Sequence, residues 1–234
     1  GLFPAKKISL KGKKVALPEE LSGEGIDDQV RNFLNLFKAW LAGEGVEVQS
    51  ISIPLLKTAV AMYYIIAPAE ASSNLARYDG VRYGFRDTGG KTLEDLYIRT
   101  RTKGFGEEVK RRIFIGNYVL SSGYYDAYYK KAMKVRYLLK EELNNVLKKY
   151  DFILSPTSPV LPFKRGEKID DPLSMYLIDI CTVFANLALL PALSIPVGIA
   201  DSGLPVGMQL TGRMFKEGEL LQAAKNWFIE GERK

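Results

Sequence analysis

The fold is decided by residues 14 to 53, which read KVALPEELSGEGIDDQVRNFLNLFKAWLAGEGVEVQSISI. Lys14 to Leu17 form a short run of strand length, and Val46 to Ile53 alternate with a period of two until a proline follows. Between them, apolar residues recur at helical spacing from Asp27 to Ala42, and two glycines end this helix. A strand, a helix and a second strand in this order predict a right-handed crossover, and therefore a sheet with parallel strands.

The middle of the chain is expected to be helical. Apolar periodicity continues from Leu55 to about Tyr150, and it is interrupted by a loop from Tyr78 to Lys91 that is rich in glycine and aspartate. Three helices are expected after this loop, since a capping box, a pair of acidic residues and a capping aspartate each mark a helix start. These starts are Thr92-Leu-Glu-Asp95, Gly106-Glu-Glu108 and Asp126.

Strands return in the last third of the sequence. We expect a buried strand at Phe152 to Leu154, two strands at Ala192 to Ile199 and Val206 to Leu210, and a final helix from about Gly218 to Ile229. Prolines in the uncharged run from Ile180 to Ala200 favour a buried helix and strand over a membrane span. The predicted class is α/β, with a mixed β-sheet covered by helices. No repeat or linker supports a second domain.

The composition removes several kinds of chemistry. The chain has 234 residues, of which 47% are hydrophobic and 26% charged, so it is composed like a globular protein. It contains no histidine, which excludes Ser-His-Asp and Cys-His catalysis and histidine-containing zinc sites within it. Its one cysteine, Cys181, lies in an apolar run and is expected to be a buried, inert thiol in a reducing compartment.

Short motifs give no independent evidence of an active site. The three Gly-x-Gly pairs lack the third glycine of a dinucleotide fingerprint, and the sequence has no Walker A pattern. Adjacent acidic residues point in different directions along a helix, so no metal site is predicted. The pairs Ser72-Ser73 and Ser121-Ser122 lack a nearby activating lysine in sequence and are poor candidates for a nucleophile.

A basic stripe runs from Arg99 to Lys140. It holds eleven lysines and arginines and three acids, and it is interleaved with tyrosines at Tyr118, Tyr124, Tyr125, Tyr128 and Tyr129. Such a stripe is most often a solvated helical face, but it could also contact the phosphates of a nucleic acid. Both interpretations stay open at this point.

Five segments, in the same order along the chain, closely resemble the amidase-signature family, and within it the glutaminase subunits of tRNA-dependent amidotransferases. They are Tyr63 to Gly84, Gly104 to Phe114, Ser121 to Tyr129, Ile169 to Pro172 and Gly203 to Gln209. The resemblance covers nearly the whole chain and is weakest in residues 1 to 50. It implies that residues 1–234 are the C-terminal part of a single amidase-signature domain with an α/β fold.

The resemblance also implies an activity and partners. A glutaminase subunit of this kind hydrolyses glutamine and passes ammonia to a partner subunit, which amidates Glu-tRNA(Gln) or Asp-tRNA(Asn). Amidotransferase subunits B and C are the implied partners, aminoacyl-tRNA is met through the complex, and ATP and magnesium belong to the partner. The implied location is the cytoplasm, or an organelle in a eukaryote, without membrane attachment.

The sequence departs from the family pattern in one respect. The family's catalytic lysine and two serines lie in a Gly/Ser-rich segment upstream of the region matched, and no Gly-Gly-Ser-Ser-Gly-Gly-like segment occurs here. We therefore expect no catalytic residue in this chain, and no activity from this chain alone. No cofactor is expected on it.

The residues carried over from the family are Tyr63, Arg112 and Asp179, which are expected to bind glutamine. An arginine can bind the α-carboxylate, an aspartate the ammonium, and a tyrosine hydroxyl can add orientation. Tyr64, the next residue, is the alternative to Tyr63 in this assignment. Structural roles are the alternatives: Tyr63 in the core, Arg112 paired with a carboxylate, or Asp179 capping a helix that begins near Cys181.

Two other functions fit the same sequence. The chain could belong to an amidase-signature hydrolase that acts on a different amide, in which case the amino-acid contacts would not matter. It could also be a non-catalytic module that binds a partner or tRNA, using the basic stripe and its lysines Lys130, Lys131 and Lys134.

Overall fold

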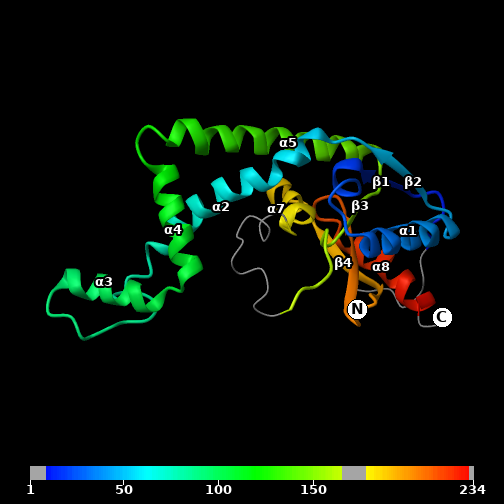
Figure 1. The fold of residues 1–234 in the computed structure, drawn as a ribbon. Helices are drawn as coiled ribbons and strands as arrows, with labels where there is room; N and C mark the ends of the chain where they lie inside the picture. The colour runs from blue at the N-terminus through cyan, green and yellow to red at the C-terminus, as the bar shows by residue number, and fades with distance from the viewer. Residues whose placement is uncertain (1–8, 165–177, 232–234) are drawn as a thin grey trace. The chain divides into compact units, whose positions relative to one another are not determined.

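The computed structural model describes residues 9–164 and 178–231 (Figure 1). Ile169 to Pro172, a segment of the family resemblance, lies outside the described residues. The chain divides into two compact units, which are described separately below. The sheet unit comprises Gly1–Val60 and Arg136–Lys234, and the helical unit comprises Ala61–Val135.

Five strands form one mixed sheet in the sheet unit, in the order β2-β1-β3-β5-β4. The strand β1 pairs in parallel with β2 and β3, whereas β5 pairs antiparallel with β3 and β4. The predicted parallel pairing of these strands around a helix and the predicted class are therefore confirmed. The strands are β1 (Lys14–Pro18), β2 (Glu47–Ile51), β3 (Phe152–Pro156), β4 (Ala192–Ile199) and β5 (Pro205–Thr211).

Helices α1 (Asp28–Gly43) and α8 (Glu217–Gly231) pack on one face of this sheet (Figure 1). Asp27 caps α1, because its side chain accepts hydrogen bonds from the amides of Gln29 and Val30. The apolar stripe of α1 enters a buried cluster with side chains of four strands and of α8. Its four buried members in α1 are Val30, Leu34, Phe37 and Leu41.

Further helices complete the sheet unit. The short helix α7 (Val183–Ala188) follows a 3₁₀ turn and precedes β4, which confirms a buried helix followed by a strand between Ile180 and Ala200. The predicted burial of that strand is wrong: β4 is an edge strand, and only Ile195 and Val197 in it are buried. The end of α5 (Lys131–Lys149) contributes buried leucines at four-residue spacing. The 3₁₀ turns of this unit are Glu19–Leu21, Pro54–Thr58 and Asp179–Cys181.

Asp151 joins three strands at one end of the sheet. Its carboxylate accepts hydrogen bonds from Lys13 Nζ at 2.8 Å, the Lys14 amide at 2.9 Å and Arg213 Nη2 at 3.2 Å. Burial opposes ionisation, but these hydrogen bonds and the two cations hold the pKa of Asp151 below its ordinary value. The start of β1, the start of β3 and the residues after β5 are thereby tied to one carboxylate.

The helical unit contains α3 (Leu93–Gly104), α4 (Glu107–Leu120) and most of α2 (Ala59–Leu75). The capping box at Thr92 and Asp95 and the helix start after Gly106 are confirmed. The predicted cap at Asp126 is wrong. A π-helical segment, Tyr125–Lys130, leads directly into α5, so Asp126 lies inside the helical run and pairs with Lys130 at 2.7 Å.

The loop before α3 is fixed by Asp87, whose side chain is only 6% exposed. Its carboxylate pairs with Lys103, accepts a hydrogen bond from the Gly89 amide at 2.8 Å and pairs with Arg99 Nε at 3.0 Å. These contacts, with that of Lys103 the strongest, lower the pKa of Asp87 far below its usual range. The glycine-rich loop predicted from the sequence is therefore ordered against α3.

Two helices of the helical unit approach closely at Gly116 of α4. A Cβ atom at this position would lie 2.1 Å from the carbonyl oxygen of Pro68 and 2.6 Å from Ser72 Cβ, both on α2. Neither backbone can yield without moving its helix. A glycine is therefore required where α2 and α4 cross.

We expect Gly116→Ala to lower the free energy of unfolding by about 1 to 3 kcal/mol, because the added methyl group overpacks this crossing. Helix propensity alone would make Gly116→Ala stabilising, because alanine is preferred over glycine within a helix. A loss of stability would therefore indicate a steric clash at the crossing. Denaturant unfolding followed by circular dichroism measures it.

The matched control is Gly43→Ala at the end of α1, where an added Cβ meets nothing within 4 Å. This control should leave stability unchanged or raise it by up to about 1 kcal/mol. If Gly116→Ala were as stable as the control, the close approach of the helices would be refuted.

Candidate functional site

Tyr63 and Arg112 meet in the helical unit, although 49 residues separate them. Tyr63 lies one turn into α2, and Arg112 lies in the second turn of α4. Arg112 Nη1 donates a hydrogen bond to the Tyr63 hydroxyl at 3.3 Å. The close crossing at Gly116, one turn further along α4, brings these two helix faces together.

Two other side chains hold the Arg112 guanidinium. Glu108 Oε1 accepts a hydrogen bond from Arg112 Nε at 2.9 Å, and the guanidinium carbon lies 5.9 Å from the centre of the Tyr64 ring. The Tyr63 hydroxyl first, and then Glu108, raise the pKa of Arg112 above its ordinary value, so the cation is permanent. The side chain is 30% exposed, which leaves it within reach of a ligand.

The geometry separates the roles of the two adjacent tyrosines. Their rings meet edge to face, with centroids 4.9 Å apart. Tyr63 contacts Arg112 through its hydroxyl, whereas Tyr64 contacts it through its ring. The Tyr63 hydroxyl therefore shares a hydrogen bond with the cation, and its role in glutamine binding stays a prediction.

Asp179 lies in the sheet unit, in the 3₁₀ turn that precedes α7. Its carbonyl accepts hydrogen bonds from the amide and the hydroxyl of Thr182, and Thr182 itself occupies the N-cap position of α7. The alternative that Asp179 caps this helix is therefore wrong. The structure brings Tyr63 and Arg112 together, while the participation of Asp179 in the same site stays a prediction.

Gln209 of β5 fixes the turn that carries Asp179. Its buried side-chain amide donates hydrogen bonds to the Cys181 carbonyl at 2.7 Å and to Ser155 Oγ at 3.3 Å. Cys181 is fully buried, and this burial raises the pKa of its thiol to about 12. The expectation of a buried thiol is confirmed, and its inertness stays a prediction.

One serine of each pair serves as a structural hydrogen-bond donor. Ser72 Oγ donates to Asn117 Oδ1 at 2.6 Å across the crossing of α2 and α4, and Ser121 Oγ donates to the carbonyl of Tyr118 at 2.7 Å. Within the described part of the chain, neither hydroxyl is hydrogen-bonded to a lysine that could take its proton. The geometry agrees with the sequence interpretation that they are not nucleophiles.

One cavity of about 360 Å³ lies in the sheet unit, beside β4, β5 and the loop after β3. The hydroxyls of Thr157 and Ser194, 2.8 Å apart, form its most polar wall. Among the described residues that line it, none carries a charge. These residues therefore lack the groups that would recognise the carboxylate and ammonium of an amino acid.

Two features are absent from the described residues. Residues 9–164 and 178–231 contain no group of three or more acidic, cysteine or histidine side chains placed to hold a metal ion. Within the same ranges, no helix combines the length and the apolar character needed to cross a bilayer.

Comparison with known proteins agrees with the mixed sheet and its covering helices. A model of the family described as "Amidase" matches residues 2–221. The chain belongs to the amidase family. Within it, the chain is similar to proteins named as the A subunit of glutamyl-tRNA(Gln) amidotransferase.

The one from Persephonella marina is 55% identical over 215 residues, which are 92% of this chain and 44% of the relative. The one from Clostridium botulinum strain Kyoto is 53% identical over 218 residues, 93% of this chain and 45% of the relative. The crystal structure of the A subunit from Thermotoga maritima aligns with a TM-score of 0.70 and 44% identity, covering 92% of this chain and 42% of that one. The chain thus spans less than half the length of these relatives.

Sequence reasoning missed the contact between Glu108 and Arg112. The sequence pattern places Glu108 only in the acidic first turn of α4, which it does occupy. The signal for the contact was present, because a glutamate four residues before an arginine lies on the same helix face. The sequence does not specify which guanidinium nitrogen donates the hydrogen bond to Glu108.

We expect Cys181 to resist thiol reagents at pH 8 in the folded protein, since it is fully buried and the raised pKa keeps the thiol protonated. Labelling with a chromogenic disulfide, followed by absorbance, should give almost no fast phase. In guanidinium chloride one thiol per chain should react. Rapid labelling of the folded protein would show that the turn at Asp179 opens readily.

Proposed function

We propose that this chain is the glutamine-binding part of a glutaminase subunit in a tRNA-dependent amidotransferase. The observation that carries the proposal is 55% identity, over 92% of the chain, to a protein named as the A subunit of glutamyl-tRNA(Gln) amidotransferase. The complete protein would hydrolyse glutamine and supply ammonia for converting Glu-tRNA(Gln) to Gln-tRNA(Gln), or Asp-tRNA(Asn) to Asn-tRNA(Asn).

The contacts of Arg112 support the recognition of an amino acid. A guanidinium can bind a carboxylate through two parallel hydrogen bonds, and Arg112 is held with its charge fixed and part of its surface open. In the proposed site Arg112 binds the α-carboxylate, Asp179 binds the ammonium, and the Tyr63 hydroxyl orients the substrate. The side-chain amide of glutamine then extends away from these charges toward the reacting groups.

The reacting groups are proposed to lie outside this sequence. The 234 residues contain no Gly/Ser-rich segment of the kind that carries the family's lysine and two serines, and the relatives are more than twice as long as the matched region. We expect this chain alone to be inactive, and to form part of a single amidase-signature domain in the complete protein. An intact mass about twice 26.2 kDa in its source would support this, and 26.2 kDa would contradict it.

The partners follow from the same proposal. Amidation of aminoacyl-tRNA requires an activated carboxyl group, so ATP and magnesium are expected on a partner subunit rather than on this chain. Subunits B and C are the expected partners. Because aminoacyl-tRNA is their shared substrate, the complex should work in the cytoplasm, or in an organelle of a eukaryote.

Arg112→Ala in the complete protein should raise the KM for glutamine by about 100-fold or more, because a charge-assisted hydrogen-bond pair to the carboxylate is lost. The turnover number should change much less, since Arg112 is expected to bind the end of glutamine remote from the reaction. Steady-state assay of ammonia release measures both constants. An unchanged KM would favour the alternative that this family member hydrolyses a different amide.

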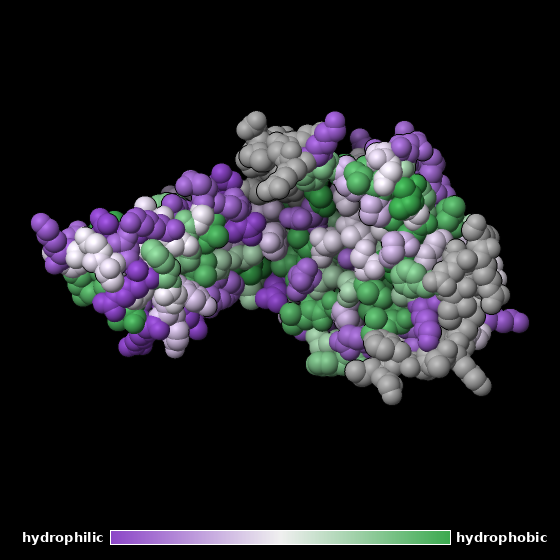
Figure 2. All heavy atoms as spheres, turned by 90° about the horizontal axis from the view of Figure 1, so that it is seen from below, coloured by the Kyte–Doolittle hydropathy of each residue, from purple (hydrophilic) through white to green (hydrophobic). Residues whose placement is uncertain are grey.

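A second candidate function is direct contact with tRNA. The helical unit holds thirteen basic and eight acidic residues, so it carries five of the six net positive charges of the chain. Hydrophilic surface dominates over α3 and α4 in Figure 2, with hydrophobic patches between. An excess of positive charge on one unit favours a polyanionic partner.

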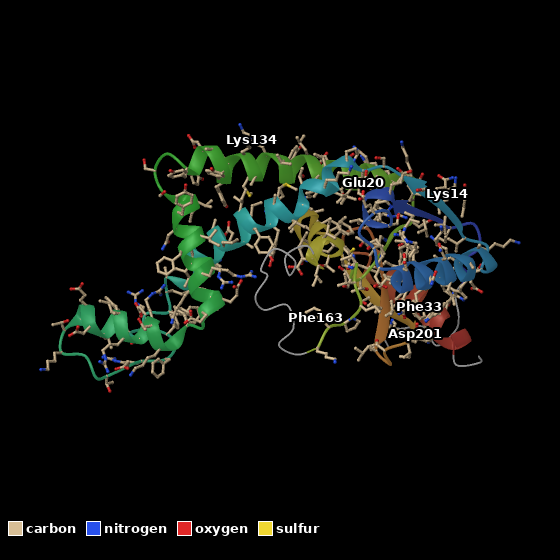
Figure 3. All side chains as sticks on the ribbon, viewed as in Figure 1. Lys14, Glu20, Phe33, Lys134, Phe163 and Asp201 are labelled. Carbon is tan, nitrogen blue, oxygen red and sulfur yellow. The ribbon has the colours of Figure 1, made fainter. Side chains whose placement is uncertain are left out.

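Tyrosines accompany this charge. Tyr118 is 52% exposed and Tyr124 40% exposed, with ring centroids 4.3 Å apart, and their hydroxyl contact raises the pKa of Tyr118 to about 12. Lys130 Nζ lies 5.4 Å from the centre of the Tyr125 ring and is paired with Asp126. Lys131 and Lys134, near the start of α5, are exposed, and Figure 3 shows Lys134 pointing outward. Exposed rings beside lysines are a common surface for RNA.

Replacing Lys130, Lys131 and Lys134 together by glutamine should weaken tRNA binding to the complete protein. The slope of log affinity against log salt should fall by about two to three, since each phosphate contact contributes somewhat less than one. The control replaces three exposed lysines of the sheet unit, Lys11, Lys148 and Lys149. Equal slopes for the two triple variants would contradict a phosphate-binding role for the stripe.

A further inference from the structure

Arg112 is held from three directions within the helical unit. Its Nε donates to Glu108 Oε1 at 2.9 Å, its Nη1 donates to the Tyr63 hydroxyl at 3.3 Å, and the Tyr64 ring lies 5.9 Å from its central carbon. These contacts come from two helices, α2 and α4. The plane of the guanidinium is therefore fixed before any ligand arrives.

The donors that remain lie at one end of this plane. A guanidinium has five N–H groups, and it can offer a carboxylate either the pair Nε and Nη2 or the pair Nη1 and Nη2. Glu108 occupies Nε, which closes the first pair. Tyr63 takes one of the two hydrogens on Nη1, so one hydrogen on Nη1 and both hydrogens on Nη2 have no partner among these contacts. Of the two pairs, only Nη1 and Nη2 then has a donor left on each nitrogen.

Glu108 is itself fixed. Its second oxygen, Oε2, accepts a hydrogen bond from Arg111 Nη1 at 2.7 Å, so each oxygen of the carboxylate has an arginine partner. Its side chain is 46% exposed, and an exposed ion pair between residues four apart in a helix contributes little to stability. Stability alone therefore gives little reason for this arrangement.

We propose that Glu108 is a positioning residue, which occupies Arg112 Nε and so presents the Nη1 and Nη2 end of the guanidinium to the α-carboxylate of an amino acid. The Tyr63 hydroxyl lies beside Nη1, where it can act together with the arginine. This inference rests on the proposed function, because Glu108 would orient the Arg112 guanidinium that is proposed to bind the carboxylate. It predicts a role in binding and none in the chemical step.

The test uses the complete glutaminase subunit with its partner subunits, and measures the kcat and KM of glutamine hydrolysis. Glu108→Ala frees Nε and lets the guanidinium rotate, so the KM for glutamine should rise about 3- to 10-fold while kcat stays within about twofold. Glu108→Gln keeps an oxygen that can accept from Nε, and should restore most of the affinity. A merely structural role would lower the amount of folded, active protein without this division between KM and kcat.

Glu107→Ala is the matched control. Glu107 is the neighbouring acid in the same helical turn, 93% exposed, and pairs with Lys110 at 3.5 Å rather than with Arg112. It should leave the KM unchanged. If Glu108→Ala behaved like this control, or if kcat fell in step with a rising KM, the inference would be overturned.

Arg112→Ala, measured in parallel, distinguishes this inference from the function on which it rests. If Arg112→Ala raises the KM strongly and Glu108→Ala does not, the carboxylate clamp stands and the positioning role fails. If Arg112→Ala leaves the KM unchanged, or if the complete protein does not hydrolyse glutamine, the proposed function fails and the role of Glu108 fails with it.

Discussion

The register of the sheet depends on the carboxylate of Asp151. The strand β3 follows this residue and is buried at every position. It therefore has no solvent-exposed polar side chain that would fix its register against the neighbouring strands. Asp151 provides such a contact, because its carboxylate accepts hydrogen bonds from Lys13 Nζ, the Lys14 amide and Arg213 Nη2. Because β3 joins the parallel half of the sheet to the antiparallel half, one carboxylate contacts residues of both halves. A slip of one residue would turn every buried side chain of β3 to the opposite face.

Much of this fold could be predicted from the sequence, because local patterns and tertiary structure agree. The alternation before Pro54, the apolar spacing in α1 and the capping box at Thr92 each specify an element that the structure contains. The cap at Asp126 failed for a physical reason: a capping residue is recognised by its type, but an aspartate within a helix can instead pair with a lysine four residues later. The wide π-helical turn there had no sequence signal that we recognised.

The candidate site was less accessible to sequence reasoning. Tyr63 and Arg112 were identified from a family resemblance, and no periodicity would have paired two residues so far apart. Their contact depends on Gly116, where the absence of a side chain lets α2 and α4 approach. Helix contacts of this kind are decided by the smallest residue in the interface, which attracts little notice in a sequence. The choice of guanidinium nitrogen by Glu108 depends on rotamers, which a sequence does not specify.

The lack of histidine, together with the buried Cys181, has a consequence for experiments on the complete protein. Histidine is the side chain whose ordinary pKa lies near neutrality, and the pKa of the Cys181 thiol is shifted further above it, to about 12. The charge of Arg112 is likewise constant across this range. An inflection near pH 7 in a rate profile would therefore have its natural origin outside this part of the polypeptide. In the proposed complex, such a profile would report on the catalytic lysine, the ammonia or the partner subunits, because the charge of Arg112 and the protonation of Cys181 do not change near neutrality.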